Sequence, residues 1–166
     1  MSLAAIRKNM LCYSPLFVVL CFQLMFWWQS RLIRPELGVV PPLPSQQEVA
    51  LLKMGDEQFY FRALSITMQT AGDTYGRFTA LKNYDMRLVS DWFRLLDTLD
   101  ARSNMMPAMA AYYFSQTQTP EDVRYLVEYL YDHSIVDVKH KWWWLLQSIY
   151  LAQHKLNDMD MALKVA

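Results

Sequence analysis

The hydrophobic positions divide the chain into two parts with different patterns. From Met10 to Trp28 the sequence reads MLCYSPLFVVLCFQLMFWW, without a charged residue. Beyond Ser45, apolar residues recur every three or four positions between polar ones, which is the period of amphipathic α-helices. No segment shows convincing alternation of apolar and polar residues, the pattern of a half-buried strand. The pattern therefore predicts one apolar helix followed by an all-α domain over residues 45–166.

The uncharged run has the features of a transmembrane helix. At ~1.5 Å per residue, residues 10–30 are long enough to cross a hydrocarbon core of ~30 Å. Basic residues flank the run on both sides, and aromatic residues close its C-terminal end, where an aromatic belt meets the lipid–water boundary. The charges are Arg7, Lys8, Arg31 and Arg34, and the belt is Phe26, Trp27 and Trp28. We expect residues 10–30 to anchor the protein in the lipid bilayer.

Two other interpretations of the run are a buried core helix and a cleaved signal peptide. A core helix of this length without a charge is uncommon in globular domains. A signal peptide would also begin with basic residues and an apolar run, but no small-x-small cleavage motif follows here. An uncleaved anchor is therefore the interpretation we favour.

The flanking charges bear on the orientation of the anchor. Arg7, Lys8 and the amino terminus stand against Arg31 and Arg34, which is nearly a tie under the positive-inside rule. We favour a cytoplasmic tail over residues 1–9 and a domain on the outer side. This is the topology of a single-pass protein of the bacterial inner membrane with its domain in the periplasm.

A proline-rich linker over residues 31–44 is expected to separate the anchor from the domain. Its segment PELGVVPPLP holds four prolines and one glycine in ten residues. Proline removes a backbone donor and disrupts a helix interior, so this linker is expected to be extended and semi-rigid. Ser45 then begins the first helix of the domain, because Ser45 and Glu48 have the spacing of a capping box.

Start and stop signals divide the domain into seven or so short helices. The expected helices cover residues 45–55, 56–71, 74–81, 85–99, 105–114, 119–132, 139–155 and 159–166, with a turn over residues 133–138. The expected inward stripes are Phe59, Ala63, Ile66 and Thr70, widened by Phe61, Leu64 and Met68; then Leu88, Val89, Trp92, Leu95, Leu96 and Leu99; and Val123, Leu126, Val127 and Leu130.

The last part of the domain resembles the tetratricopeptide repeat (TPR) family. Leu146, Ile149 and Tyr150 precede the segment KLNDMDMA over residues 155–162. These residues are similar to that family's helix A, its leucine–glycine–aspartate–aromatic turn and the small alanine early in helix B. Asn157 stands where the family has glycine, and asparagine tolerates left-handed backbone. Met159 replaces the usual aromatic residue.

Upstream, the resemblance is looser. Asp100–Ser103 is similar to the end of a repeat, with Ala101 in place of proline. The offset from Val123 to Ala162 is 39 residues, against ~34 in the standard unit. The resemblance implies a stack of α-α hairpins with a groove that binds other proteins. Ala166 ends an apolar helical run without a polar cap, so we expect a truncated repeat array or an end that packs on a partner.

Composition indicates binding rather than catalysis. Hydrophobic residues make up 54% and charged residues 19%, so part of the chain is expected to lie outside water. The formal net charge of +0 gives no reason to expect nucleic acid as a partner. Cys12 and Cys21 both fall in the apolar run, which leaves the domain without a disulfide or a cysteine zinc site. We expect no catalytic, metal or cofactor-binding residues, and no enzyme.

The remaining polar motifs have structural explanations. His133, His140 and His154 lack the spacing of a metal site and are expected to be surface or capping residues. Asp158 and Asp160 form a D-x-D pair, which sugar transferases use with a nucleotide fold that is not expected here. Acidic residues at a helix N-terminus explain this pair better.

The most unusual feature of the domain is the run Trp142-Trp143-Trp144. Consecutive side chains on a helix point ~100° apart, so the three rings cannot all lie in one core. The helix is either sandwiched between two neighbours or exposes tryptophan to a partner, with stacking on a glycan ring as a third option. The candidate partner-binding residues are His140, Lys141, Trp142, Trp143, Trp144 and Gln147.

Together these features predict a membrane-anchored scaffold or assembly factor whose partners are other proteins of a membrane complex. An accessory structural subunit of a larger membrane complex is the alternative, and a glycan-binding module is a third interpretation.

Overall fold

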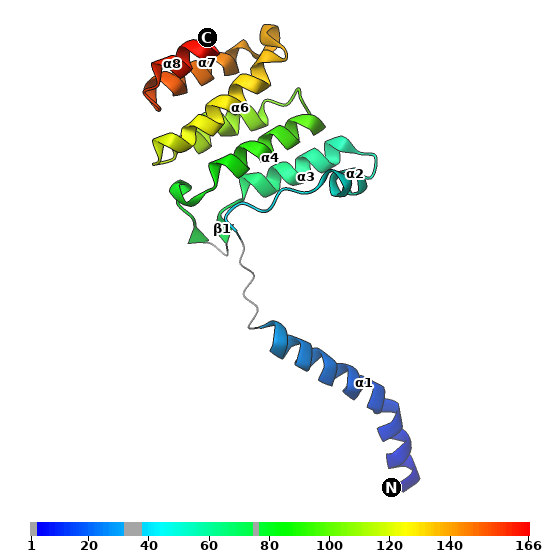
Figure 1. Ribbon diagram of the computed structural model, residues 1–166. Coiled ribbons are helices and arrows are strands. Elements are labelled where there is room, and N and C mark those ends of the chain that lie inside the picture. The colour runs from blue at the N-terminus through cyan, green and yellow to red at the C-terminus, as the bar shows by residue number, and fades with distance from the viewer. Residues whose placement is uncertain (1–2, 32–37, 75–76) are drawn as a thin grey trace. The chain divides into compact units, whose positions relative to one another are not determined.

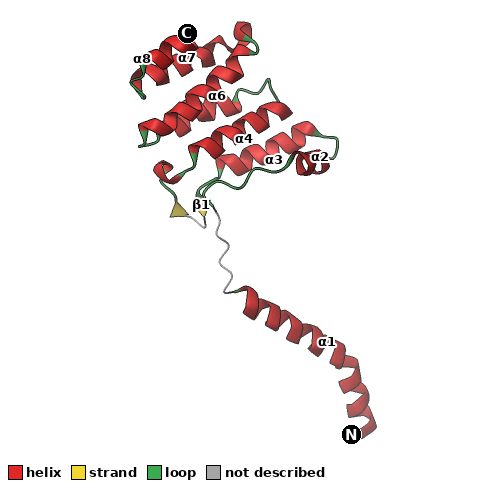
Figure 2. Ribbon diagram, viewed as in Figure 1, coloured by secondary structure: helices red, strands yellow, loops and turns green. Residues whose placement is uncertain are grey.

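The computed structural model describes residues 3–31, 38–74 and 77–166, except for the side chains of residues 3–12, 14, 74 and 77. The chain divides into two units, residues 1–36 and 37–166. The described parts of both units are built from helices, with a single pair of two-residue strands in the second (Figure 1, Figure 2). The all-α class expected from the sequence pattern is therefore confirmed.

The first unit contains the helix α1 (Leu3–Ser30). It extends over most of the expected tail, residues 1–9, and over the expected anchor, residues 10–30. The side chains from Leu16 to Leu20 are all exposed, so this part of the helix presents apolar surface on every side. Within the described part of the chain, no helix meets the length and apolarity needed for a membrane span. Arg7, Lys8 and Arg34, on which the orientation depends, lie outside the described side chains.

The elements of the second unit are, in chain order, α2 (Gln46–Leu52), α3 (Glu57–Gln69), β1 (Asp73–Thr74), β2 (Arg77–Phe78), η1 (Leu81–Asn83), α4 (Met86–Leu99), α5 (Met105–Ala108), η2 (Met109–Tyr113), η3 (Phe114–Gln116), η4 (Pro120–Asp122), α6 (Val123–Ile135), α7 (Val138–His154) and α8 (Met159–Val165). η2 is a π-helical turn, and the other η elements are 3₁₀ turns.

The end of the proline-rich stretch packs on this second unit. Val40 is buried in the core, and the indole Nε1 of Trp92 donates a hydrogen bond to the carbonyl oxygen of Pro41 at 2.8 Å. The structure thus differs from the expected linker over residues 31–44, because residues 39–41 belong to the helical unit. Residues 32–37 lie outside the described part of the chain.

Three predicted helix starts are confirmed. The Ser45 and Glu48 side chains exchange the two hydrogen bonds of a capping box at the start of α2. Asp85 caps α4 by accepting from the Leu88 amide at 3.0 Å. Asp158 caps α8 in the same way.

The inward face of α3 differs from the predicted one. Phe59 and Ile66 are 69% and 59% exposed, whereas Tyr60 and Met68 are buried, as is Phe61, which was expected only to widen the stripe. Both sets have helical spacing, so periodicity alone does not identify the inner one. Met68 packs inside the unit because α3 lies along α4 on that side.

The helix predicted over residues 74–81 is wrong. β1 and β2 pair antiparallel in this segment, with Asp73 opposite Phe78. Gly72, at φ +81°, turns the chain after α3 immediately before β1. The short segment is also rich in threonine and aromatic residues, which favour strands.

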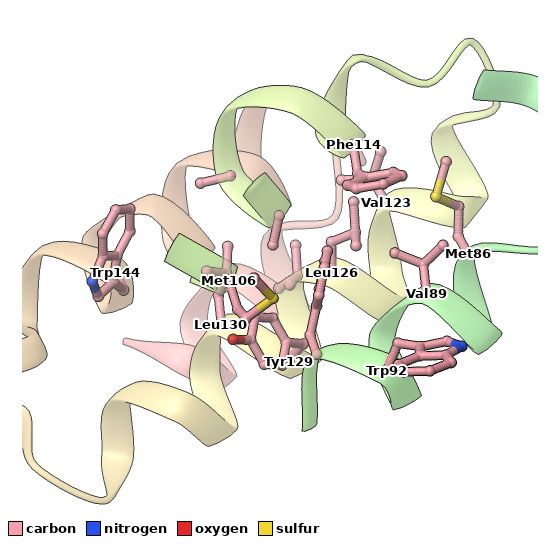
Figure 3. Close-up of a cluster of buried hydrophobic side chains, with 14 of the residues drawn as sticks. Met86, Val89, Trp92, Met106, Phe114, Val123, Leu126, Tyr129, Leu130 and Trp144 are labelled. Carbon is pink, nitrogen blue, oxygen red and sulfur yellow. The ribbon is translucent and has the colours of Figure 1, made fainter. Parts of the chain in front are cut away.

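The inward stripes predicted for α4 and α6 are confirmed. Every large side chain predicted for the α6 stripe is at most 1% exposed, and Leu88 and Leu95 of α4 are partly buried against the same core. Phe93 of α4 and Tyr129 of α6 are also fully buried, and their rings are 5.2 Å apart. Figure 3 shows Tyr129 and Leu126 among the residues of this core.

Two further boundaries differ from the prediction. The helix expected over residues 105–114 is three short pieces, because it passes through the π-helical turn η2 and ends at Gln116. His133, placed in a turn by the sequence, lies in the last turns of α6 and is buried, so α6 reaches Ile135. The chain then reverses within two residues before α7.

The packing order follows the chain. α3 packs on α4, α4 on α6, α6 on α7, and α7 on α8 (Figure 1). α7 also contacts η2, the middle of the segment between α4 and α6. This second contact positions the surface described next.

Candidate functional site

The tryptophan run places one ring inside the unit and two outside. Trp144 is buried (Figure 3). Its indole Nε1 donates to Oδ1 of Asn104 at 2.9 Å. A buried indole N–H needs such a partner, so this bond fixes the rotation of α7 about its axis. Trp142 and Trp143 are 56% and 43% exposed as a result. The prediction that the three rings cannot share one core is confirmed.

The side of α7 opposite Trp144 is an exposed, largely apolar surface. Trp143, Leu146 and Tyr150 are three and four positions apart and therefore share one face of the helix. All three are exposed. Trp142 lies at the edge of this face, with its ring edge-on to Trp143 at 5.7 Å between ring centroids. We call Trp142, Trp143, Leu146, Gln147 and Tyr150 the α7 outer face.

A neighbouring segment holds part of this surface in place. The indole Nε1 of Trp143 donates to the hydroxyl of Tyr112 in η2 at 2.9 Å. Farther along, the Lys155 ammonium donates to Oε1 of Gln116 at 3.3 Å. These bonds join α7 to the segment of residues 104–116, so the aromatic surface extends over two elements.

A groove runs along the C-terminal half of this face. It has a volume of about 320 Å³ and is lined by Leu146, Gln147, Ile149, Tyr150 and Gln153. Its lining carries no charge, and two glutamine amides provide hydrogen-bonding groups at its edge. A groove of this composition suits apolar side chains presented by a polar backbone.

The structure divides the six candidate residues into two sets. Trp142, Trp143 and Gln147 lie on the α7 outer face. The others point elsewhere: Trp144 is buried, the Lys141 ammonium donates to the carbonyl oxygen of His133 at 3.2 Å, and His140 Nδ1 lies 2.9 Å from the Asp137 carboxylate. Lys141 and His140 thus interact with the turn between α6 and α7.

Sequence reasoning missed three residues that build this surface. Asn104 and Tyr112 were not predicted. Asn104 lies 40 residues before its partner Trp144, and Tyr112 lies 31 residues before its partner Trp143, so neither hydrogen bond leaves a local pattern in the sequence. Tyr150 was noted only for the repeat resemblance, although its spacing of seven from Trp143 placed it on the same face.

The aromatic residues predicted to form a membrane belt are exposed at the end of α1. Trp27 and Trp28 are 56% and 59% exposed, and Phe26 is 72% exposed. The Arg31 guanidinium lies 3.6 Å from the ring centroid of Trp28 and 5.4 Å from that of Trp27. A cation stacked on two indoles has the character of an interfacial cluster.

A second, charged groove of about 530 Å³ lies between α6 and α8. Arg124 pairs with Asp158 at 3.0 Å, and Arg94 pairs with Asp132 at the same distance. Both guanidinium groups in this groove are thus already neutralised by carboxylates. The two ion pairs cross-link α6 to α8 and to α4. Glu128, Asp160 and Lys164 also line this groove.

A buried polar network joins α4 to α6. One carboxylate oxygen of Asp97 accepts from the Tyr129 hydroxyl at 3.2 Å, and the other lies 2.6 Å from Nδ1 of His133. Burial, and then the negative charge of Asp97, raise the pKa of the Tyr129 hydroxyl. The second ring nitrogen of His133 is buried without a hydrogen-bond partner. The His133 ring is buried and the Asp97 carboxylate is partly exposed, and both line a cavity of about 240 Å³ together with Tyr129. The pair joins α4 to α6.

Within the described residues, no group of three or more histidine, cysteine or carboxylate side chains is placed to hold a metal ion. Asp158 binds the first turn of α8 and Arg124, which accounts for half of the D-x-D pair. No protein family, curated protein or solved structure matches the chain.

Proposed function

We propose that this chain is a membrane-anchored protein-interaction module, a scaffold or assembly factor for a membrane complex. In this proposal the α7 outer face binds a partner protein, and residues 10–30 hold the helical unit at a bilayer. The observation that carries the proposal is the pairing of exposed tryptophan and tyrosine rings with an uncharged groove. Exposed aromatic residues beside such a groove are typical of the central residues of protein interfaces.

Hydrogen bonds that hold α7 and its exposed rings in place also support this assignment. Trp143 is fixed by its bond to Tyr112, and α7 by the bond from Trp144 to Asn104. Rings that are held in place before binding lose less conformational entropy when a partner docks. The surface is therefore suited to binding without rearrangement.

The proposed anchor rests on the sequence and exposure of α1. Met10 to Trp28 carry no charge, and the described apolar side chains of this helix are exposed on all sides. Pro15 lies within the helix, where membrane-spanning helices tolerate proline better than soluble ones. The cluster of Trp27, Trp28 and Arg31 suits the lipid–water boundary.

A TPR-like stack remains part of the proposal, supported by the α7–α8 hairpin. Asn157 takes a left-handed φ of 54° in the turn where the family has glycine. Ala162 is 6% exposed on α8, which packs against α7, as a small residue at a close helix crossing would be.

Binding through α7 is tested by affinity purification of the full chain from detergent-solubilised membranes. Replacing Trp142, Leu146 and Tyr150 together by alanine is expected to lower recovery of a stoichiometric partner at least ~30-fold, since one hot-spot residue contributes ~2 kcal/mol. The control replaces three other exposed apolar residues, Val136, Met159 and Leu163, by alanine. Equal recovery with both triple variants would remove the proposal.

The anchor is tested separately by alkaline carbonate extraction of membranes. The native chain is expected to stay in the pellet, whereas Val19→Arg with Leu20→Arg is expected to release it, because each arginine costs ~3 kcal/mol at the centre of a span. Ser30→Arg, at the last residue of the proposed anchor and next to Arg31, is the control. Release of the native chain would show that it is not an integral membrane protein.

A further inference from the structure

The charges around the α7 outer face are all of one sign. Residues 104–119 contain no charged side chain, and residues 138–156 contain three lysines and no carboxylate. These are the two segments that the bonds of Trp143, Trp144 and Lys155 join. The chain as a whole has 16 basic and 16 acidic residues, so the absence of Asp and Glu from these two segments differs from its average composition.

Lys139 lies at the N-terminal end of this positive region, in the first turn of α7. It is four positions before Trp143 and seven before Leu146, so it lies on the same helix face. It is exposed and has no hydrogen-bond or ion-pair partner among the described residues. Lysine in the first turn of a helix is opposed by the positive end of the helix dipole, which makes Lys139 unfavourable in the free chain.

The two polar neighbours of Lys139, His140 and Lys141, differ from it because their side chains have partners. Lys141 donates to the C-terminal carbonyl of His133, the negative end of α6, and His140 lies against Asp137. At the other end of the face, His154 packs on the Tyr150 ring with 4.7 Å between centroids. The uncompensated positive charge therefore sits beside the apolar surface and not within the turn.

We infer that the α7 outer face binds an acidic amphipathic protein segment, whose apolar side chains fill the groove and whose carboxylates lie near Lys139 and Lys155. This inference rests on the proposed function and names the class of partner for that face. A carboxylate near Lys139 would be favoured both by the ammonium group and by the positive end of α7. The uncharged groove lining accepts the apolar residues without burying an unpaired charge.

The shape and hydrogen bonding of the face favour a protein segment over a lipid surface. The indole N–H of Trp143, which lies on this face, already donates to the Tyr112 hydroxyl and is not free for a headgroup. A groove of about 320 Å³ matches protruding side chains better than the plane of a bilayer.

The test is selection of a random-peptide display library on the full chain held in nanodiscs of zwitterionic lipid. Counter-selection uses the same nanodiscs with Leu146→Ser and Tyr150→Ser. Enriched peptides are expected to have net negative charge and apolar residues at helical spacing. Enrichment of neutral or basic peptides, or no enrichment over the counter-selection, would overturn the inference.

Binding titrations with a selected peptide then separate the contribution of charge to affinity from that of apolar contact. Binding of a selected peptide is expected to weaken about tenfold with Lys139→Glu at 50 mM salt, and the difference is expected to shrink at 500 mM as screening increases. Lys164→Glu on α8 makes the same charge change beside the charged groove and is expected to leave binding unchanged. Equal effects of the two substitutions would contradict a role for charge at α7.

The outcomes distinguish this inference from the proposed function. If the alanine triple variant loses its partner but Lys139→Glu does not weaken binding, the interaction module stands and the acidic class of partner is wrong. If the triple variant keeps its partner, the proposed function itself fails. Tight binding of anionic vesicles that needs the α7 residues, without peptide enrichment, would assign the face to lipid instead.

Discussion

α3 and α7 both carry large apolar side chains on two opposite faces, but their outer faces are organised differently. On α3, Phe59 and Ile66 are exposed, and the hydroxyls of Thr67 and Thr70 bond to carbonyl oxygens of their own helix. On α7, the outer face is bonded to another segment through Trp143 and borders a groove. The proposal of a partner surface therefore rests on α7, where a second element fixes an exposed ring, and not on the exposed apolar side chains of α3.

The largest expected change in stability distinguishes the buried side of α7 from its exposed side. Trp144→Ala should lower the free energy of unfolding by about 4 kcal/mol, because removal of this buried indole leaves a cavity. Trp142→Ala, at an exposed position, should change it by less than about 1 kcal/mol. Urea unfolding followed by circular dichroism measures both. Similar losses for the two variants would mean that Trp142, too, is part of the core.

Comparing a buried with an exposed phenylalanine of α3 tests which face of this helix is the inner one, because the apolar spacing predicted the wrong face. Phe61 is 5% exposed and Phe59 is 69% exposed. Phe61→Ala is therefore expected to cost about 3 kcal/mol in urea unfolding, and Phe59→Ala less than about 1 kcal/mol. If Phe59→Ala proved the more costly, the stripe predicted from the sequence would be the inner one after all.

These two helices also show what the sequence could and could not predict. The stripes of α4 and α6 were predictable because each helix is amphipathic with one apolar face. α3 and α7 have two, and the inner face is selected by partners distant in the sequence, such as Asn104 for Trp144. Trp142, Trp143 and Gln147 of the α7 outer face were therefore predicted, but the sequence did not show that Trp144 lies on the opposite, buried side.

Local signals predicted helix ends better than they predicted irregular segments. Ser45, Asp85 and Asp158 cap helices as expected, because a cap depends on neighbours three residues away. The β1–β2 pair and the burial of His133 depend on contacts outside their own segments. Asp97, which binds His133 from α4, lies 36 residues away.

Gly72→Ala tests how the end of α3 is held. The Tyr84 hydroxyl donates to the Ala71 carbonyl at 2.7 Å, and a Cβ on Gly72 would lie 1.8 Å from that hydroxyl oxygen. With a φ of +81° as well, the substitution should cost about 2 kcal/mol in urea unfolding. Gly55→Ala has a similar φ but open space, and should cost about 1 kcal/mol. If the two substitutions lowered the free energy of unfolding equally, the Tyr84 ring would have moved away from the new Cβ without a cost.

Alkaline unfolding tests the network of α6, the helix on which α7 packs. Burial raises the pKa of Tyr129 in the folded state, so only the unfolded chain loses this proton above about pH 10. The stability contributed by the protonated hydroxyl is present below that pH and falls by about 1.4 kcal/mol per pH unit above it. Tyr129→Phe should remove that slope between pH 10 and 11, measured by thermal unfolding. Parallel profiles for the two proteins would contradict the raised pKa.

The smallest expected effect concerns the bond that organises the α7 outer face. Trp143→Phe and Tyr112→Phe each remove one partner of the indole–hydroxyl hydrogen bond. At exposed positions, a double-mutant cycle should give a coupling free energy of about 0.5 kcal/mol in unfolding. The same cycle in peptide affinity should give more, because the bond holds the ring ready for a partner. A coupling that is zero in both would make α7 equivalent to α3, with exposed rings that no second element fixes.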